Sequence, residues 1–319
     1  MGPRRLACLL IAFWMIPISS SPAEDTPPIL EDKRPYTLTV GVREWLSHGQ
    51  SAHNIGDSRA NVRSELTWRG LNSAITEVNA DLVVLQRLLM NMSIGYGTIG
   101  SGTLLDQDWD GNNRTQKVSE TLSRSDNGSV LIISITPGVR VFHWSIQDNP
   151  VLGGVDVLLG YQLWQEKYAA YGLQDIVPGG RDIPSNVNGV TQTNQWLSLR
   201  FGTRATVPLL SFLSFKASAF YIPVNNYHQS DVHHLRDDLR QDPSFLTTVT
   251  GGNGVQLEGS VSVRVWRQLT AEAGYRYWDI KSGQGIVTEY NADGTIGQGR
   301  HNVDNTKRQG VFFGINWIF

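Results

Sequence analysis

Thiol chemistry is nearly absent from this chain of 319 residues, because its only cysteine is Cys8. Cys8 lies in the short apolar run 6–18, which follows the charged pair Arg4-Arg5 and precedes a stretch of small residues ending at Ala23. A basic start, an apolar segment and a small-residue site are typical of a secretory signal peptide. We therefore expect residues 1–23 to be removed after Ala23, leaving a mature chain without disulfides or reactive thiols.

Long hydrophobic runs and a surplus of positive charge are also missing. The apolar run 6–18 is too short to span a bilayer as a helix, and none that follows it is longer. The chain carries 27 basic and 29 acidic side chains; without Arg4 and Arg5 the balance is 25 against 29, or about −4. A chain with no basic surplus is not expected to bind nucleic acid.

Alternating segments rich in aromatic residues and glycine recur along the chain, which has 32 Gly, 10 Trp, 10 Tyr and 10 Phe. One apolar and one polar face over roughly ten residues is typical of an outer-membrane β-strand. Strands of a soluble sandwich also alternate but are usually shorter. The sequence predicts ten strands, at 36–47, 62–78, 81–98, 129–146, 152–171, 191–206, 209–225, 253–267, 269–288 and 306–319.

The alternation also predicts which side chains face lipid and which face the lumen of a barrel. The polar residues that alternate with the apolar ones should point inward. We expect the lumenal set to be Glu65, Arg200, Glu258 and Arg264, and the lipid-facing set to be Leu66, Trp68, Leu197, Leu199, Phe201, Val261 and Val263.

The predicted connections alternate between tight and long, as they do in bacterial barrels with short periplasmic turns and long extracellular loops. The chain ends on Phe319 after alternating apolar residues, which resembles the C-terminal signal of outer-membrane proteins. The predicted fold is all-β: a single transmembrane antiparallel barrel of ten strands over residues 36–319, after a periplasmic lead at 24–35. The tight turns are expected at Asn79-Ala80, 148–150, Val207-Pro208 and Arg267-Gln268, and the long loops at 48–61, 99–128, 172–190, 226–252 and 289–305.

Two acidic clusters lie in loops predicted at the same end of the barrel. Asp106, Asp108 and Asp110 alternate along the chain, so an extended backbone would aim them the same way. Asp231 and His233 are likewise two residues apart, and a carboxylate beside an imidazole raises its basicity. Strands three and seven of a ring of ten lie on opposite walls. The clusters are therefore expected to face each other across the mouth, with room for a water molecule between them.

Two other interpretations of these residues are open. Asp106, Asp108 and Asp110 begin like a calcium loop, but the twelfth position is Lys117, where such a loop has Glu. The acidic cluster could also be a solvated loop without function. His233 could be an ordinary exposed loop histidine, as we expect of His228 and His234.

Several motifs resemble the omptins in order and spacing. They are Ser64-Glu65-Leu66-Thr67-Trp68, Ser93-Ile94-Gly95-Tyr96-Gly97, Ser101-Gly102, Asp106-Gln107-Asp108-Trp109, Leu159-Gly160-Tyr161-Gln162 and Asp231-Val232-His233. Omptins are ten-stranded outer-membrane endoproteases with an Asp pair on one wall and an Asp-His dyad on the other. The resemblance implies that Asp106 with Asp108 is the pair, that Asp231 with His233 is the dyad, and that they activate a water molecule.

The same resemblance implies an aspartyl-type endopeptidase in the bacterial outer membrane, acting on peptides or proteins with its active face extracellular. We expect a monomer without cofactor or metal, in contact with outer-membrane lipid, and with lipopolysaccharide as a candidate activator. Gln50 or Ser51, and Gln229, stand where omptins that prefer basic substrates carry acids. At the family's lipopolysaccharide contacts Tyr161 remains, while Leu163 and Gln165 replace charged residues.

Two further functions are compatible with the same fold. The first is a non-catalytic barrel that serves as an adhesin, a receptor or a structural protein. The second is a lipid A-modifying enzyme, although no serine-histidine arrangement in the sequence argues for it. The distance between the two clusters across the mouth separates the peptidase from the non-catalytic barrel.

Overall fold

The computed structural model describes residues 35–146, 149, 151–176 and 182–319. The predicted signal peptide and almost all of the periplasmic lead lie outside these residues. Within them, 3-10 helix η1 (Asn112–Arg114) is the only helix, and no helix is long and apolar enough to cross a membrane.

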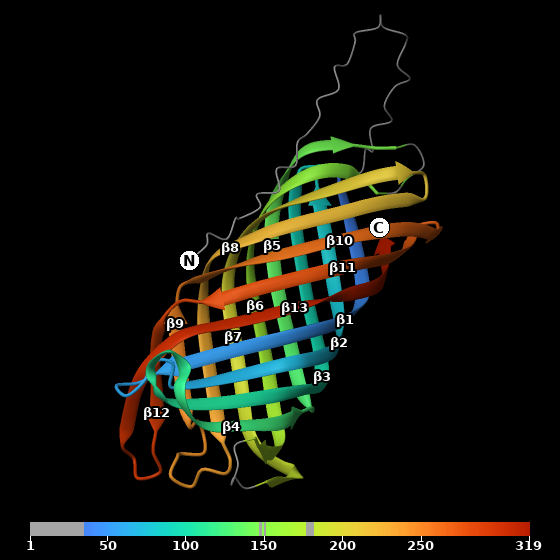
Figure 1. Ribbon diagram of the computed structural model, residues 1–319. Helices are drawn as coiled ribbons and strands as arrows, with labels where there is room; N and C mark the ends of the chain where they lie inside the picture. The colour runs from blue at the N-terminus through green and yellow to red at the C-terminus, as the bar shows by residue number, and fades with distance from the viewer. Residues whose placement is uncertain (1–34, 147–148, 150, 177–181) are drawn as a thin grey trace, which may run out of the picture. The chain divides into compact units, whose positions relative to one another are not determined.

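Ten strands form a closed antiparallel ring, as the alternation predicted (Figure 1). Each strand pairs with the next along the ring, and pairing of the first strand with the last closes the barrel. The ring consists of β1 (Tyr36–Gly56), β2 (Ser64–Val84), β3 (Leu88–Gly111), β5 (Gly128–Trp144), β6 (Gly153–Asp175), β7 (Ile183–Leu210), β8 (Leu213–His233), β10 (Gly252–Trp266), β11 (Leu269–Ser282) and β13 (Ile296–Ile318).

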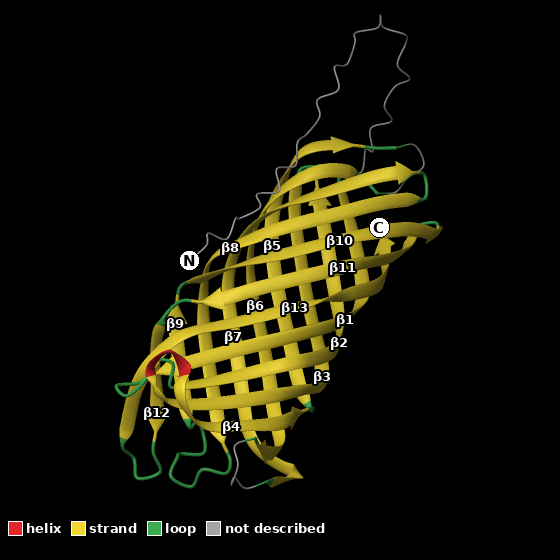
Figure 2. Ribbon diagram, viewed as in Figure 1, coloured by secondary structure: helices red, strands yellow, loops and turns green. Residues whose placement is uncertain are grey.

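Three more strands continue the wall at one end of the barrel (Figure 2). They are β4 (Thr115–Ser125), β9 (Phe245–Thr250) and β12 (Gly285–Tyr290). There, β4 bridges β3 and β6, while β9 and β12 bridge β8 and β13. The prediction of long loops at 99–128 and 226–252 is therefore wrong in part, because much of both segments is strand. Both do emerge at the same end, as predicted, and the candidate residues within them lie on strands.

The predicted turns are right at one position and displaced at two. Arg267 and Gln268 lie between β10 and β11 as expected. Asn79-Ala80 and Val207-Pro208 lie inside strands, and the chain reverses a few residues later, at 85–87 and 211–212. Leu85 and Gln86 take the positive φ that the first of these turns requires, although neither residue type signals a turn. Of the turn predicted at 148–150, only Asn149 lies within the described residues.

An apolar belt surrounds the outside of the barrel. Phe201, Val261, Phe313 and Ile315 are exposed on it, as the alternation predicted for the first two. Arg200 is buried on the inner face of β7, and Glu258 forms ion pairs with lumenal arginines, as predicted. The remaining lipid-facing predictions, Leu197, Leu199 and Val263, also point outward, and Arg264 alternates with Val263 and Val265 toward the inside.

The prediction that Leu66 and Trp68 face lipid is wrong. Both point inward, with 4% and 0% of their surface exposed, and Glu65 instead pairs with Arg114 at the outer surface. The pairing of β2 with β3 shifts beside Gly70, whose φ is +62°, and an extra residue in a strand turns the following side chains to the opposite face. Beyond this shift the strands extend past the apolar belt. Their outer face therefore contacts water, and apolar side chains fill the inside.

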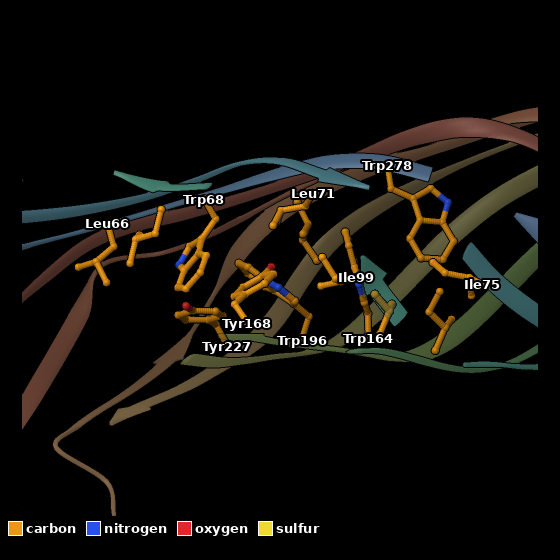
Figure 3. Close-up of a cluster of buried hydrophobic side chains, with 14 of the residues drawn as sticks. Leu66, Trp68, Leu71, Ile75, Ile99, Trp164, Tyr168, Trp196, Tyr227 and Trp278 are labelled. Carbon is orange, nitrogen blue, oxygen red and sulfur yellow. The ribbon is translucent and has the colours of Figure 1, made fainter. Parts of the chain in front are cut away.

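Buried aromatic side chains project into the lumen from facing walls and follow one another along the strands, from Trp68 to Trp278 (Figure 3). The rings of Trp68 and Tyr168 stack at 4.9 Å, and those of Trp196 and Tyr227 lie 4.3 Å apart. All four are fully buried. We call these four residues, together with Trp45, Trp164 and Trp278, the aromatic layer. The ring centroid of Trp278 lies 5.1 Å from that of Trp45 and 5.2 Å from that of Trp164.

A buried ion pair connects this layer to four strands. Arg308 on β13 pairs with Glu166 on β6, which also accepts hydrogen bonds from Trp164 at 3.1 Å and from Tyr168. Arg308 Nη1 donates to Ser73 Oγ on β2 at 2.7 Å and to Ser47 Oγ on β1 at 3.1 Å. Neither charge contacts solvent, so the loss of one partner would leave the other buried and unpaired.

We expect Arg308→Ala to lower the free energy of unfolding by roughly 3–5 kcal/mol, the usual cost of breaking a buried ion pair. Urea titration of the refolded protein in lipid vesicles measures the change. Arg59→Ala is the matched control, because 72% of that side chain is exposed, and it should have almost no effect. Equal stabilities for the two variants would contradict the structural role given to Arg308.

Candidate active site

Asp106 and Asp108 point into the mouth of the barrel from β3. Asp108 is paired in register with Ser64 and Asp106 with Leu66 on β2. Before the pairing shifts between β2 and β3, odd-numbered residues of β3 point inward, and Ile99 is the last of them. After the shifts, the even-numbered residues Leu104, Asp106 and Asp108 point inward. Asp110 does not follow them, because a shift after Asp108 turns it toward an ion pair with Arg63. The expectation that all three carboxylates share one face therefore holds for two.

Asp231 and His233 point into the same mouth from β8. A shift between β7 and β8, near Val224, moves the inward positions from Ile222 to Asn225, Tyr227, Gln229 and Asp231. His233 Nε2 lies 3.8 Å from Asp231 Oδ1, a contact rather than a tight hydrogen bond. Gln229 Nε2 donates to Asp231 Oδ2 at 2.8 Å and holds that carboxyl group in place.

The segment after β8 fixes the backbone of the dyad. Ser244, which is fully buried, donates its backbone N–H to the carbonyl of Asp231 at 2.8 Å. The hydroxyl of Ser244 accepts the backbone N–H of His233 at 3.0 Å. The ring of Phe245 meets the imidazole of His233 edge to face, with 5.2 Å between the centroids. Sequence reasoning missed Ser244, whose role depends on the fold of this segment.

The two clusters lie within electrostatic reach of each other. The pKa of Asp106 is raised to about 8. Burial is the largest cause, and the charges of Asp108 and of Asp231 on the facing wall add to it. Asp106 Oδ1 is inaccessible to solvent and has no hydrogen-bond partner. Burial raises the pKa of Asp108 as well, against the hydrogen bond from Ser64 and the charges of Arg63 and Arg236. The Asp pair thus retains a proton near neutral pH.

The dyad is also less charged than its residue types suggest. Burial raises the pKa of Asp231 to about 7, although hydrogen bonds from Gln229 and from the backbone of Phe245 oppose this shift. Burial, assisted by the charges of Arg236 and His234, lowers the pKa of His233 to about 4. A carboxylate beside the imidazole leads one to expect a pKa above 6.5; here loss of solvent outweighs that attraction. His233 is therefore a neutral base over most of the pH range.

The backbone of residues 106–117 does not have the shape of a calcium-binding loop. Residues 106–111 belong to strand β3, so the chain does not wrap around a central point as a calcium loop does. Across the part of the chain that the structure describes, no three His, Cys, Asp or Glu side chains are grouped to hold a metal ion.

A buried carboxylate that the sequence analysis did not identify lies beneath the dyad. Gln50 is exposed on the outer face of β1, whereas Ser51 is fully buried, so Ser51 is the one that faces the lumen. The hydroxyl of Ser51 lies 3.5 Å from Asp304 Oδ1 on β13, and Tyr227 donates to Asp304 Oδ2 at 2.9 Å. Asp304 was missed because 289–305 was expected to be a loop. The alternation of Asp304 with Thr306 and Arg308 was the signal from which an inward position on a strand could have been predicted.

Comparison with solved structures places this geometry in a known fold. The chain superposes on the outer membrane protease OmpT from Escherichia coli with a TM-score of 0.73 at 14% sequence identity, covering 92% of this chain and 99% of that one. The family model for Protochlamydia outer membrane protein matches residues 37–166. The resemblance to the omptins is thus confirmed as a shared fold, and the chain is an outer-membrane β-barrel.

Other similarities are weaker. A Pseudomonas aeruginosa FadL homologue aligns over 88% of this chain and 90% of its own at 8% identity, with a TM-score of 0.29. OmpT, an outer membrane protein of Vibrio cholerae, aligns over 88% of this chain and 98% of its own at 8% identity, with a TM-score of 0.15. No curated protein matches the sequence. With TM-scores this low, neither of these two alignments carries an argument about the fold.

We expect Asp106→Asn to stabilise the protein at high pH. The pKa of Asp106 lies above the value of an unfolded Asp, about 3.9, so the folded state holds the extra proton between about pH 4 and 8, and stability falls as the pH rises through that window. Above pH 8 the variant should gain at least about 1.4 kcal/mol, the equivalent of one pKa unit. Below pH 4 the two proteins should be alike.

Urea titrations at pH 4, 6 and 9 measure this difference. Asp110→Asn is the matched control, because Asp110 is 49% exposed and pairs with Arg63 at the surface. The control should change stability by less than about 1 kcal/mol and show no gain at high pH. A pH-independent effect of Asp106→Asn would argue against a retained proton.

Proposed function

We propose that this barrel is an outer-membrane endopeptidase that hydrolyses peptide bonds at the cell surface. The observation that supports it is the position of the two clusters: Asp231 on β8 contributes to the raised pKa of Asp106 on β3, 125 residues earlier in the chain. An acidic group and a basic group that face each other are what hydrolysis by an activated water molecule requires. The shared fold with a protease supports the same assignment.

In the proposed mechanism the neutral imidazole of His233 is the general base. Its Nε2 faces Asp231 at 3.8 Å, which leaves Nδ1 to take a proton from the water. The water oxygen then bonds to the carbonyl carbon of the peptide. The proton on His233 passes to the leaving amine as the C–N bond breaks. No covalent enzyme intermediate forms.

The Asp pair has the complementary role in this proposal. Asp106 keeps a proton near neutral pH, and a carboxylic acid can donate a hydrogen bond to the carbonyl oxygen, where negative charge develops. Asp108, whose charge acts on Asp106, accepts a hydrogen bond from the attacking water. One wall therefore removes a proton from the water while the opposite wall positions it.

We expect His233→Ala to lose several orders of magnitude in rate, because general base catalysis alone contributes roughly 10²–10⁴-fold. The assay uses detergent-refolded protein with lipopolysaccharide and a mixed peptide pool, read by mass spectrometry. His234→Ala is the control: His234 follows His233 directly, and its Nε2 lies 2.9 Å from Thr191 Oγ1, outside the mouth. Equal turnover by wild type and His233→Ala would refute the mechanism.

The pH profile of the same reaction tests the assigned protonation states. The base must be neutral and Asp106 protonated, so the rate should be retained between about pH 4 and about 8 and fall outside these limits. Asp106→Ala should be comparably damaging, and Asp108→Ala somewhat less so. An inactive wild type would favour the non-catalytic barrel.

We expect cleavage that is not confined to bonds after Arg or Lys. Gln229 and Ser51, which face the lumen beneath the dyad, carry no charge, and Asp304 is fully buried beneath Tyr227. Glu44 cannot replace an acid here, since it lies on the outer face, where Thr76 donates to it at 2.7 Å. Digestion of a peptide library measures the preference, and strict cleavage after basic residues would show that a carboxylate reaches the substrate.

A further inference from the structure

The lumen holds a second polar space, below the aromatic layer and away from the candidate active site. Its volume is about 90 Å³, whereas a single water molecule needs roughly 10–15 Å³ on the same measure. Four carboxylates and five cationic side chains line it. They are Glu77, Asp81, Glu258 and Glu272, and Arg43, Arg200, Arg204, Lys216 and Arg276. The cavity therefore carries a surplus of one positive charge.

The carboxylates in this cavity are already engaged. Glu258 pairs with Arg43 at 2.8 Å and with Arg276 at 2.7 Å, and Glu77 pairs with the same two arginines. These four side chains form a neutral square.

The other two acids are occupied elsewhere in the cavity wall. Asp81 holds Arg204 at 2.8 Å and Lys216 at 3.9 Å. Glu272 accepts hydrogen bonds from Ser260 at 2.6 Å and Asn316 at 3.1 Å. Each carboxylate is thus committed to a partner other than Arg200.

Arg200 is the cation left without a counter-ion. Among the described residues no carboxylate lies within ion-pair distance of it, and only 6% of the residue is exposed. Its Nη1 donates to Gln256 and its Nη2 to Thr136, both neutral acceptors at 2.8 Å, and its guanidinium carbon lies 4.6 Å from the centre of the Phe220 ring. Its Nε is buried and has no hydrogen-bond partner. A buried, uncompensated guanidinium is costly.

We propose that the Nε–H of Arg200 binds a small monovalent anion of halide size in this cavity. One negative charge cancels the surplus and satisfies the free donor at once. Glu77 and Glu258 lie close enough to act on Arg200 electrostatically, and they would repel a multivalent anion such as phosphate more strongly than a monovalent one. A neighbouring cavity at the periplasmic end shares Asn79, Asp81, Arg204 and Lys216 with this one, so only side chains separate the two spaces. This site is independent of the proposed peptidase activity.

The first test measures thermal unfolding of the refolded protein in sodium chloride, sodium bromide and sodium gluconate at equal ionic strength. An anion that binds only the folded state raises the melting temperature, so both halides should raise it by a few degrees in a saturable manner, and the bulky gluconate should not. Arg200→Gln should abolish the difference. Lys216→Gln is the matched control: it removes a charge from the same cavity and should retain the halide effect.

The second test needs only the wild-type protein, and it remains decisive if Arg200→Gln does not fold. Crystals soaked in bromide should show one lumenal anomalous peak within hydrogen-bond distance of Arg200 Nε. The proposal is overturned if no such peak appears, or if chloride, bromide and gluconate give the same melting temperature. It is also overturned if Lys216→Gln and Arg200→Gln lose the halide effect equally, because net charge alone would then explain it.

Discussion

The barrel depends on a change of face where its wall leaves the membrane. A strand alternates with a period of two, so without interruption an inward position stays inward along its whole length. Inside the belt the outer face must be apolar, whereas above it the outer face meets water and the lumen becomes the dry side. The pairing shifts beside Gly70 and near Val224 meet both requirements, because beyond each shift the inward and outward positions of the strand are exchanged. The same shifts bring Asp106, Asp108 and Asp231 to the inner face.

The dryness of the upper lumen also sets the charge state of the site. Trp68, Tyr168, Trp196 and Tyr227 leave little solvent beneath the mouth, and burial is the largest cause of the raised pKa values of Asp106 and Asp231 and of the lowered pKa of His233. All three groups therefore favour their neutral forms. The arrangement destabilises the folded barrel at high pH, and it supplies an acid and a base poised on opposite walls.

The ten strands could be predicted because the alternation within the belt is regular. Asp106, Asp108, Asp231 and His233 were selected as candidates because of their spacing and the omptin resemblance, and their catalytic roles stay a prediction. Sequence reasoning failed where the environment changes along a strand. Leu66 and Trp68 looked lipid-facing, since nothing in their local pattern marks the height at which the outer solvent becomes water. Asp304 was hidden in a polar stretch taken for a loop. The pKa of His233 depends on burial, which spacing does not encode.

The aromatic layer has a consequence for the cell that contains this barrel. Buried rings from facing walls meet across the lumen, as Trp68 meets Tyr168 and Trp164 meets Trp278, and the ion pair between Arg308 and Glu166 connects them to the strands. Because these rings expose almost no surface to solvent, side chains fill the lumen at their level, and the barrel is not a water-filled channel there. Insertion of such a barrel therefore adds no pore to the outer membrane.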